Sequence, residues 1–436
     1  MKKTACIVTL GCKANQFESA AMEQQLINCG YHLCSFEQGA ELVVVNTCTV
    51  TAATDVQSRK LLRRARRFNP ECKILVTGCY AQINPQQLMD LPGVDLVFGN
   101  MEKQNFHNLL IQVGAQSSKV QVGDISKART CPELEIASFA EHSRAFVQIQ
   151  SGCNAFCSYC IIPFARGRSR SVAVAAVIDQ IQTLVNNGYQ EVVLTGIHIG
   201  NYGRDLPTPT SLAQLVLTIL KHTDLHRLRL GSIEPLELTA ELIAVVAANK
   251  RVCPHFHVPL QSGSDAVLQR MNRHYTAGQF SDCLASINEQ LTNPAIGVDL
   301  ITGFPAESDA EHQATVELVA SLPISFMHVF PYSRRAGTAA ATMPEQVLSS
   351  VAKERAAQLR EIGAAKQNQY MQQHIGTQLE VVVEKRKHDH QWRGVSAEYL
   401  PVTFTSEQDV AGACLAVKIV DIALNGSSLQ GVVLAE

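Results

Sequence analysis

Three cysteines lie within eight residues of one another in the segment SGCNAFCSYCIIPFARGRSRS, which spans residues 151–171. Cys153, Cys157 and Cys160, here called the loop set, follow the spacing C-x3-C-x2-C directly after a predicted strand that ends at Gln150. Thiolates this close together can bind a metal centre or carry out thiol chemistry. Because the segment contains no obvious fourth thiol, whatever completes the set decides which chemistry it performs.

Three kinds of site are compatible with this spacing. A structural zinc ion needs four ligands, and the chain has no second C-x2-C pair, so His198 or Cys131 would have to complete the site. A catalytic dithiol would use Cys157 and Cys160 and leave Cys153 without a role. A four-iron cluster on three thiolates leaves one iron open to a small molecule. In this last alternative, the absence of a fourth protein ligand is what allows a small molecule to bind.

A second group of cysteines, here called the sheet set, could converge near the amino terminus. Cys12, Cys48 and Cys79 each stand just beyond a predicted strand, at its carboxyl end. Ligand sites in open parallel sheets lie off these ends, so side chains far apart in sequence can meet there. The other cysteines of this region do not share the position, and we interpret them as small buried hydrophobic residues: Cys6, Cys29, Cys34 and Cys72.

The elements that would position the sheet set alternate between strand and helix. Buried apolar runs predict strands at 4–12, 41–48, 72–79 and 94–100. Helical periodicity and stop signals predict helices at 16–30, 51–70 and 84–91. This alternation predicts an α/β fold in which a doubly wound parallel sheet has helices on both faces.

The rest of the chain predicts two further folds. Six strands separated mostly by helical stretches are typical of a (β/α) partial TIM-like barrel, whose chemistry lies at the carboxyl ends of its strands. A helix-rich connector then leads to short strands that predict a small β-barrel, a fold that often binds nucleic acid. The expected divisions are a first domain, a linker, a barrel core and a terminal barrel: 1–112, 113–138, 139–370 and 371–436.

Composition limits the possible functions. With 436 residues, 46% hydrophobic and 17% charged, the chain predicts about three globular domains. No apolar run approaches the ~20 residues of a membrane-spanning helix, and the apolar patch 5–10 is too short for an export signal. We therefore expect a cytoplasmic protein whose 14 cysteines serve metal binding or catalysis rather than disulfides. The net charge of −2 requires any nucleic-acid site to come from local basic patches.

The surroundings of both cysteine sets resemble one known family. The C-x3-C-x2-C motif is similar to that of the radical S-adenosylmethionine (SAM) superfamily. EVVLTGIHIGNYG, HVPLQSGSDAVLQRMNRHY, DLITGFPAES and VFPYSRRAGTAA, in that order, resemble its methylthiotransferase branch. TLGCKANQFES, VVNTCTVTAATDVQSR and VTGCYAQ resemble the amino-terminal domain of the same branch, and the last segment resembles the small RNA-binding TRAM barrel in length and position.

The resemblance implies two [4Fe-4S] clusters and SAM as cofactors. The loop set would hold the cluster that binds SAM and reduces it to a deoxyadenosyl radical, and the sheet set would hold an auxiliary cluster that presents a methylated sulfur. All six cysteines are therefore candidate catalytic and metal-ligating residues. The implied partners are a tRNA substrate, an external one-electron donor and a sulfur donor.

Short flanking motifs resemble one subfamily in particular. TLGCK and NTCTVT are similar to members that transfer a methylthio group to C2 of N6-threonylcarbamoyladenosine at position 37 of tRNA. Relatives that act on isopentenyladenosine or on a ribosomal-protein aspartate carry different residues around these cysteines, and they remain alternative substrates. Ser151 departs from the acidic residue that usually precedes Gly152. A non-enzymatic alternative is an iron–sulfur scaffold that binds RNA.

Two further groups of residues are candidate contacts. Polar residues and glycines at barrel strand ends could bind SAM, although such groups equally often satisfy loop backbone: Thr195, Gly196, Ser232, Glu234, Gln261 and Gly303. Basic residues with one tryptophan could contact RNA phosphates and stack on bases, although they could equally form ordinary surface: Arg166, Arg168, Lys385, Arg386, Lys387, Trp392 and Arg393.

Overall fold

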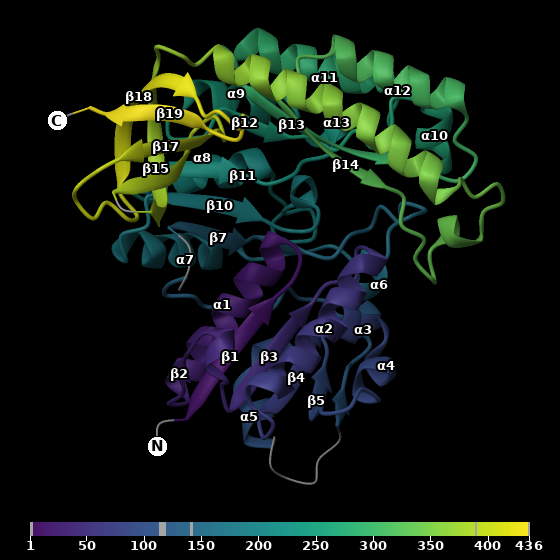
Figure 1. The fold of residues 1–436 in the computed structure, drawn as a ribbon, viewed down its shortest axis with the longest axis vertical. Helices are drawn as coiled ribbons and strands as arrows, with labels where there is room; N and C mark the ends of the chain where they lie inside the picture. The colour runs from purple at the N-terminus through teal and green to yellow at the C-terminus, as the bar shows by residue number, and fades with distance from the viewer. Residues whose placement is uncertain (1–2, 113–118, 140–142, 389, 435–436) are drawn as a thin grey trace.

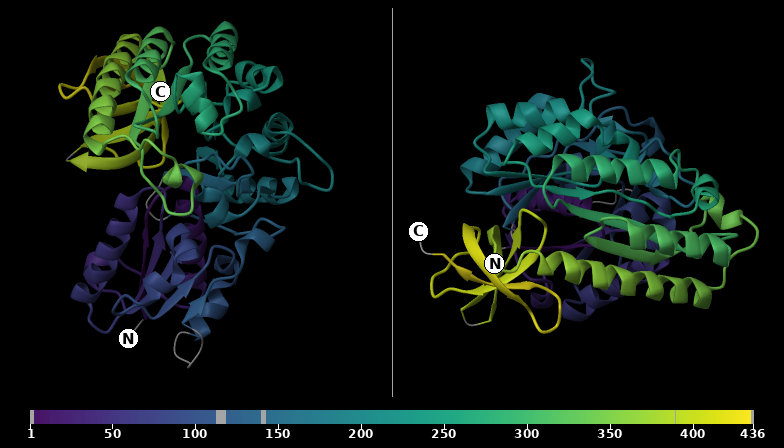
Figure 2. Two further views of the ribbon diagram at one scale, coloured as in Figure 1. Left: turned by 90° about the vertical axis from the view of Figure 1, so that its right-hand side faces the viewer. Right: turned by 90° about the horizontal axis from the view of Figure 1, so that it is seen from above.

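A computed structural model describes residues 3–112, 119–139, 143–388 and 390–434. Three groups of elements follow one another along the chain: an amino-terminal sheet with its helices, a central set of strands and helices, and a small β-barrel at the carboxyl terminus (Figure 1). A long helix leads from the central group into this last barrel (Figure 2). Within the described chain, no helix combines the length and the apolar character that crossing a membrane requires.

The amino-terminal group is a parallel sheet in the order β2-β1-β3-β4-β5-β6. The strands are β1 (Thr4–Thr9), β2 (His32–Leu33), β3 (Leu42–Thr47), β4 (Lys73–Gly78), β5 (Leu96–Phe98) and β6 (Val120–Gln121). The helices are α1 (Lys13–Asn28), α2 (Ala52–Phe68), α3 (Cys79–Ile83), α4 (Pro85–Met89) and α5 (Phe106–Gln112). Alternate residues pack on opposite faces: Val43 and Val45 against α2, α3 and α4, Leu42 and Val44 against α1 and α5. The doubly wound arrangement is confirmed.

Two edge strands of this sheet were not predicted. β2 and β6 have two residues each, which is too short for a hydrophobic period to show in the sequence. Val120 and Gln121 of β6 pair with β5. Part of the segment 113–138, interpreted from the sequence as a linker, therefore completes the first sheet, while residues 113–118 lie outside the described part of the chain.

The central group contains the six predicted strands in chain order. They are β7 (Arg144–Gln148), β10 (Glu191–Thr195), β11 (Arg227–Leu230), β12 (His255–His257), β13 (Ala295–Thr302) and β14 (Phe326–Pro331). They form two parallel three-stranded sheets. Isolated β-bridges connect the two sheets, from Leu228 to Val252 and from Ser232 to His257. The described β7 and β14 do not pair, so the barrel is partial, as expected. A short antiparallel pair, β8 (Gln150–Ser151) and β9 (Arg170–Ser171), flanks the cysteine loop.

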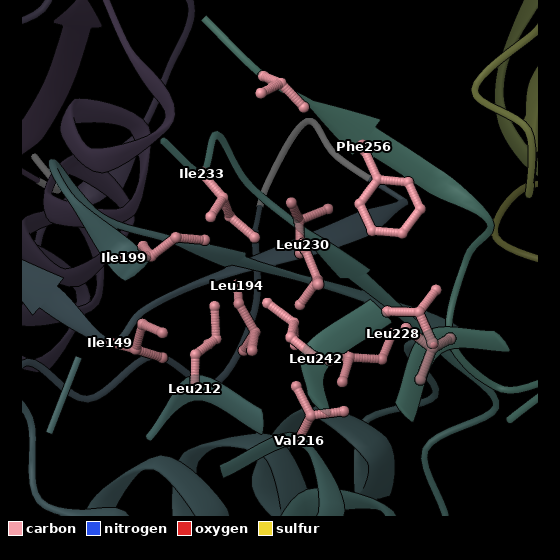
Figure 3. Packing of buried hydrophobic residues seen from close by; sticks show 14 of the residues in the cluster. Ile149, Leu194, Ile199, Leu212, Val216, Leu228, Leu230, Ile233, Leu242 and Phe256 are labelled. Carbon is pink, nitrogen blue, oxygen red and sulfur yellow. The ribbon is translucent and has the colours of Figure 1, made fainter. Parts of the chain in front are cut away.

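Helices cover the outside of these strands. They are α7 (Val174–Asn186), α8 (Leu212–His222), α9 (Ala240–Ala248), α10 (Asp265–Arg270), α11 (Ala277–Gln290), α12 (Asp309–Ser321) and α13 (Ser349–Gln372), whereas α6 (Ile162–Arg166) packs against α3 of the amino-terminal group. The outward-facing side chains Leu194 and Leu230 pack with Leu212 and Val216 of α8 and with Leu242 of α9 (Figure 3). α1 of the first sheet packs against β7 and shares this core. The same apolar core therefore fixes the first sheet to the open side of the barrel.

The last group is a closed five-stranded barrel in the order β15-β16-β17-β19-β18. Its strands are β15 (Gln378–His388), β16 (Gln391–Ser396), β17 (Pro401–Thr405), β18 (Cys414–Ile422) and β19 (Leu429–Val433). β16 and β17 are separated by a turn at Tyr399, whose φ is +63°. The predicted small β-barrel is confirmed.

Buried charges attach this barrel to the starts of the central strands. The Glu191 carboxylate accepts hydrogen bonds from Arg227 (2.6 Å) and Arg229 (2.8 Å), and all three side chains are buried. The two guanidinium groups also donate to the backbone carbonyls of Val395 and Ser396, each at 2.8 Å. These buried charges thus hold the small barrel against the core through the backbone of β16.

Candidate functional site

The sheet set lies where three neighbouring strands end. β1, β3 and β4 are adjacent in the sheet; Cys48 and Cys79 directly follow β3 and β4, and Cys12 comes shortly after the end of β1. Gly11 and Cys48 are so close that a Cβ built on Gly11 would lie 2.8 Å from the Cys48 Sγ. Burial raises the pKa of Cys48 to about 11, with a further contribution from the thiols of Cys79 and Cys12. The strand ends therefore bring these three cysteines together, as the sequence predicts.

Buried cations stand beside the sheet set. Lys103 and Arg166 share one carboxylate, that of Glu18; the Lys103 Nζ is 2.5 Å from it, and Arg166 pairs with both of its oxygens. Burial raises the pKa of the Cys79 thiol, and the positive charges of Arg166 and Lys103 offset part of that increase. Two buried positive charges against one carboxylate leave an excess that thiolates can balance. The surroundings thus fit a negatively charged metal–thiolate centre.

A glycine before Cys79 offers a test of this geometry. Gly78 has a φ of +98°, and an added Cβ would lie 2.2 Å from the Thr47 carbonyl oxygen. Gly78→Ala should therefore displace Cys79 and lower the iron content. It should cost about 1–3 kcal/mol of unfolding free energy from overpacking, beyond the strain of a positive φ. Gly188→Ala is the matched control, because Gly188 has a φ of +87° and nothing within 4 Å. Equal iron content in both variants would contradict the assignment.

The loop set lies in the turn between β8 and α6. The Ala155 N–H donates to the Cys153 Sγ (3.4 Å), and Arg273 donates to the Cys157 Sγ (3.4 Å). Burial raises the pKa of Cys160 to about 12, with contributions from Cys157 and Cys153. The three thiols therefore act on one another and are surrounded by donors suited to thiolate sulfur.

Neither candidate fourth ligand completes a zinc site here. The His198 Nδ1 lies 3.4 Å from the Cys153 Sγ, but its Nε2 is bound to Glu237 at 2.9 Å. Burial lowers the pKa of His198, whereas its bonds to Cys153 and Glu237 raise it to about 10, so both ring nitrogens already have partners. Cys131 is instead buried in the central hydrophobic core.

The spacing of the sulfurs also argues for a larger centre. Among the described residues, ligand atoms of three side chains come within 4.8 Å of one another in two groups: His226, Glu380, Cys414 and His257, Asp299, His328. Neither cysteine set is one of these groups. A single tetrahedral zinc ion would draw its sulfur ligands to ~3.8 Å of one another. Thiols spaced more widely fit a multi-iron cluster, so both sets are compatible with [4Fe-4S] centres.

A cavity adjoins Cys160 of the loop set. Its volume is about 240 Å³. Val50 and Thr51, just after Cys48, line one side; Cys160, Gln261 and the inner faces of β13 and β14 line the rest. Arg335, which follows β14, donates hydrogen bonds to Asp55 (2.7 Å) and Thr49 of the amino-terminal domain. The cavity therefore adjoins one cysteine of the loop set and the chain beside one cysteine of the sheet set.

Two of the predicted SAM contacts adjoin the loop set. Glu234 forms an ion pair with Arg273, which itself donates to Cys157. Gln261 has a φ of +67°, and its backbone bridges to β13 through Asp299 and Ile301. This left-handed conformation directs a polar residue to the wall of the cavity. Arg273 lies within the quoted motif RMNRHY, but the sequence alone assigned it no role.

The other four predicted SAM contacts differ in their burial. They are Thr195, Gly196, Ser232 and Gly303. Thr195 is buried at the end of β10, whereas Ser232 is exposed. The two glycines are enclosed, since an added Cβ would lie 2.7 Å from Ile199 at Gly196 and 2.3 Å from Ala352 at Gly303. Close packing alone therefore explains why both positions are glycine.

The assignment of Arg166 to RNA is corrected by its burial. Arg166 is 1% exposed and binds Glu18 and Asn15, the latter at 2.5 Å. Both partners belong to α1, so Arg166 ties the helix after the loop set to the first sheet. Arg170, in the same basic run, is also buried. Arg168 is exposed, with its guanidinium 5.7 Å from the Phe156 ring centre.

Only some residues of the predicted carboxyl-terminal basic patch are exposed. The residues predicted to contact RNA there are Lys385, Arg386, Lys387, Trp392 and Arg393. Lys385, Arg386 and Lys387 are exposed on β15, and Arg393 is half-buried. Trp392 is 4% exposed and packs in the barrel core, so its assignment as a stacking platform is wrong. Its side chain faces inward because it alternates with outward residues along β16.

Comparisons with known proteins agree with this arrangement. Residues 4–99 match the family described as "Uncharacterized protein family UPF0004", and residues 147–319 match the "Radical SAM superfamily". The chain is 39% identical to "Threonylcarbamoyladenosine tRNA methylthiotransferase MtaB" of Bacillus subtilis, over 95% of this chain and 93% of that protein. The Aquifex aeolicus protein of the same name is 37% identical, over 86% and 91%.

More distant proteins were also matched. A "tRNA-2-methylthio-N(6)-dimethylallyladenosine synthase" of Pelotomaculum thermopropionicum is 33% identical, over 89% of this chain and 88% of that protein. Among solved structures, the radical SAM methyltransferase TsrM of Kitasatospora setae aligns with a TM-score of 0.58 and 15% identity, over 78% and 77% of the two chains. At that identity the likeness concerns the fold alone.

Proposed function

The chain belongs to the radical SAM methylthiotransferases, and on that premise we propose that it transfers a methylthio group to C2 of N6-threonylcarbamoyladenosine at position 37 of tRNA. The observation that carries the proposal is the full-length similarity, at 37–39% identity, to two proteins named for this reaction. The cavity lined by Cys160 of the loop set and by Val50 and Thr51, just after Cys48, supports it, because a flat base that must reach both sets needs a space of this kind.

The proposed mechanism assigns distinct tasks to the two sets. Two [4Fe-4S] clusters and SAM, once bound, would supply a carbon-centred radical and a transferable methylated sulfur. The loop set holds one centre at the carboxyl ends of the central strands, with Arg273 and the Ala155 N–H donating to its sulfurs. The sheet set holds the other beside Lys103 and Arg166, whose charges favour thiolate. The apolar walls of the cavity exclude water from the reacting base.

The experiment that tests the function uses the purified, reconstituted enzyme with SAM and a reductant. Nucleoside mass spectrometry should find a methylthio group on RNA that carries threonylcarbamoyladenosine, and not on RNA that carries dimethylallyladenosine. The reverse preference would reassign the substrate. Failure to form deoxyadenosine under any condition would support the non-enzymatic scaffold instead.

The proposal includes further partners and a location. Each turnover needs an electron from a one-electron donor and a sulfur atom from a sulfur donor, because SAM supplies neither. Since the proposed substrate is tRNA, we place the enzyme in the cytoplasm.

Lys385, Arg386 and Lys387 form the exposed basic stretch that we propose for tRNA phosphate binding. Replacing all three with glutamine should weaken tRNA binding and flatten its dependence on salt, by about one unit of the logarithmic slope for each phosphate that is no longer neutralised. Filter binding over a range of salt concentrations measures both quantities. Replacing the exposed Lys221 of α8 with glutamine is the control. An unchanged slope in the triple variant would make the stretch ordinary surface.

A further inference from the structure

Lys13 directly follows Cys12 and reaches the inner face of the partial barrel. Its Nζ lies 5.7 Å from the centre of the Tyr399 ring, which the small barrel inserts among the central strands. The charged groups that act on this ammonium include Arg144, Arg229 and Glu191, from the starts of β7, β11 and β10. Lys13, the first residue of α1, therefore contributes its side chain to the lining of the partial barrel.

Lys13 is the cation of this lining that lacks a carboxylate. Arg144 binds Glu384 at 2.6 Å, and Arg229 binds Glu191 at 2.8 Å. Among the described residues, the Lys13 ammonium forms no ion pair and no hydrogen bond, and it lies over the Tyr399 ring. A half-buried ammonium without a partner is costly, and a bound anion would remove that cost.

A polar path joins Lys13 to the cavity beside the loop set. Asp299 lines that cavity and binds His257 at 3.0 Å, and the rings of His257 and His328 stack at 5.6 Å. These three side chains come from β12, β13 and β14, and the charge of Lys13 acts on His328. His328 is exposed, so the path is open.

We propose that Lys13 binds the carboxylate of the threonylcarbamoyl group when the base enters the cavity. This inference rests on the proposed function. C2 must lie between the two cysteine sets, so the substituent on N6 of the same ring extends beside the gap, along the inner face of the barrel. A dimethylallyl group has no charge and would leave Lys13 unpaired. Lys13 thus favours substrates with an acidic N6 substituent.

The test measures binding to the reconstituted full-length enzyme without SAM. Three anticodon stem-loop RNAs are compared by fluorescence anisotropy: one with threonylcarbamoyladenosine, one with its methyl ester, and one with unmodified adenosine. The wild type should bind the acid about 10-fold more tightly than the ester, because the ester lacks the charge. Lys13→Gln should bind acid and ester alike, and Lys13→Arg should keep the preference.

Controls separate this inference from the function it rests on. Lys221→Gln should retain the wild-type preference, and iron content should be equal in all the variants compared. Equal binding of acid and ester by the wild type, which no folding defect can cause, would overturn the inference. So would a preserved preference in Lys13→Gln. Failure of the wild type to methylthiolate the acid RNA would overturn the proposed function, while a 10-fold preference for the acid would still support the carboxylate site.

Discussion

Cys153→Ala is expected to abolish deoxyadenosine formation, whereas Cys48→Ala is expected to preserve it and abolish only sulfur transfer. The two residues belong to different cysteine sets, and in the proposed mechanism each set supplies three thiolates to its own centre. With two ligands left, a cluster is not retained, so each variant should lose about four irons per chain. Only the loop set offers its open iron to SAM in the proposed mechanism, and radical formation should therefore follow Cys153 alone.

Iron analysis, chromatography of deoxyadenosine after adding dithionite, and nucleoside mass spectrometry measure the three quantities. Cys283→Ala is the matched control, because Cys283 is a half-buried thiol of α11 outside both sets. It should retain all three properties. Loss of deoxyadenosine in Cys48→Ala with the loop cluster intact would contradict the division of tasks. Full iron content in either variant would contradict the assignment of ligands.

Much of this arrangement was predictable from local patterns. Buried strand runs with a cysteine just beyond them placed the sheet set, because the carboxyl ends of parallel strands share one edge. The six central strands were predictable for a related reason: each is a short stretch with buried apolar residues, bounded by glycine, proline or polar residues. Period and strand polarity, which are local properties, suffice to bring these residues together.

Long-range pairing was not predictable. Arg166 stands in a basic run that indicates a surface, yet its partner Glu18 is 148 residues away and draws it into the interior. The sequence likewise contains no sign that Lys103 shares the same carboxylate. Trp392 is a different case, since it lies among basic residues but alternates inward along β16. A strict application of strand alternation would have placed Trp392 in the core.

Glu191→Ala is expected to lower the free energy of unfolding by about 3–5 kcal/mol, because it leaves buried guanidinium groups without their carboxylate. Arg227 and Arg229 bind Glu191 at 2.6 and 2.8 Å, and the Glu191 side chain is fully buried. Burial alone would raise the pKa of Glu191, but Arg229 and Arg227 lower it to about 2. The folded pKa is thus below the unfolded value of about 4.3. The stabilisation is therefore fully present above pH 4.3 and is lost as the pH falls toward 2.

The same substitution should loosen the small barrel. Arg227 and Arg229 can donate to the carbonyls of Val395 and Ser396 only while Glu191 holds them in place, so β16 loses its attachment to the core. Urea unfolding and limited proteolysis of the full-length protein measure stability and release separately. Glu241→Ala removes an exposed carboxylate of α9 and should change neither. If Glu191→Ala unfolded at the wild-type urea concentration with the wild-type cleavage pattern, the buried charges would not be what joins the small barrel to the central strands.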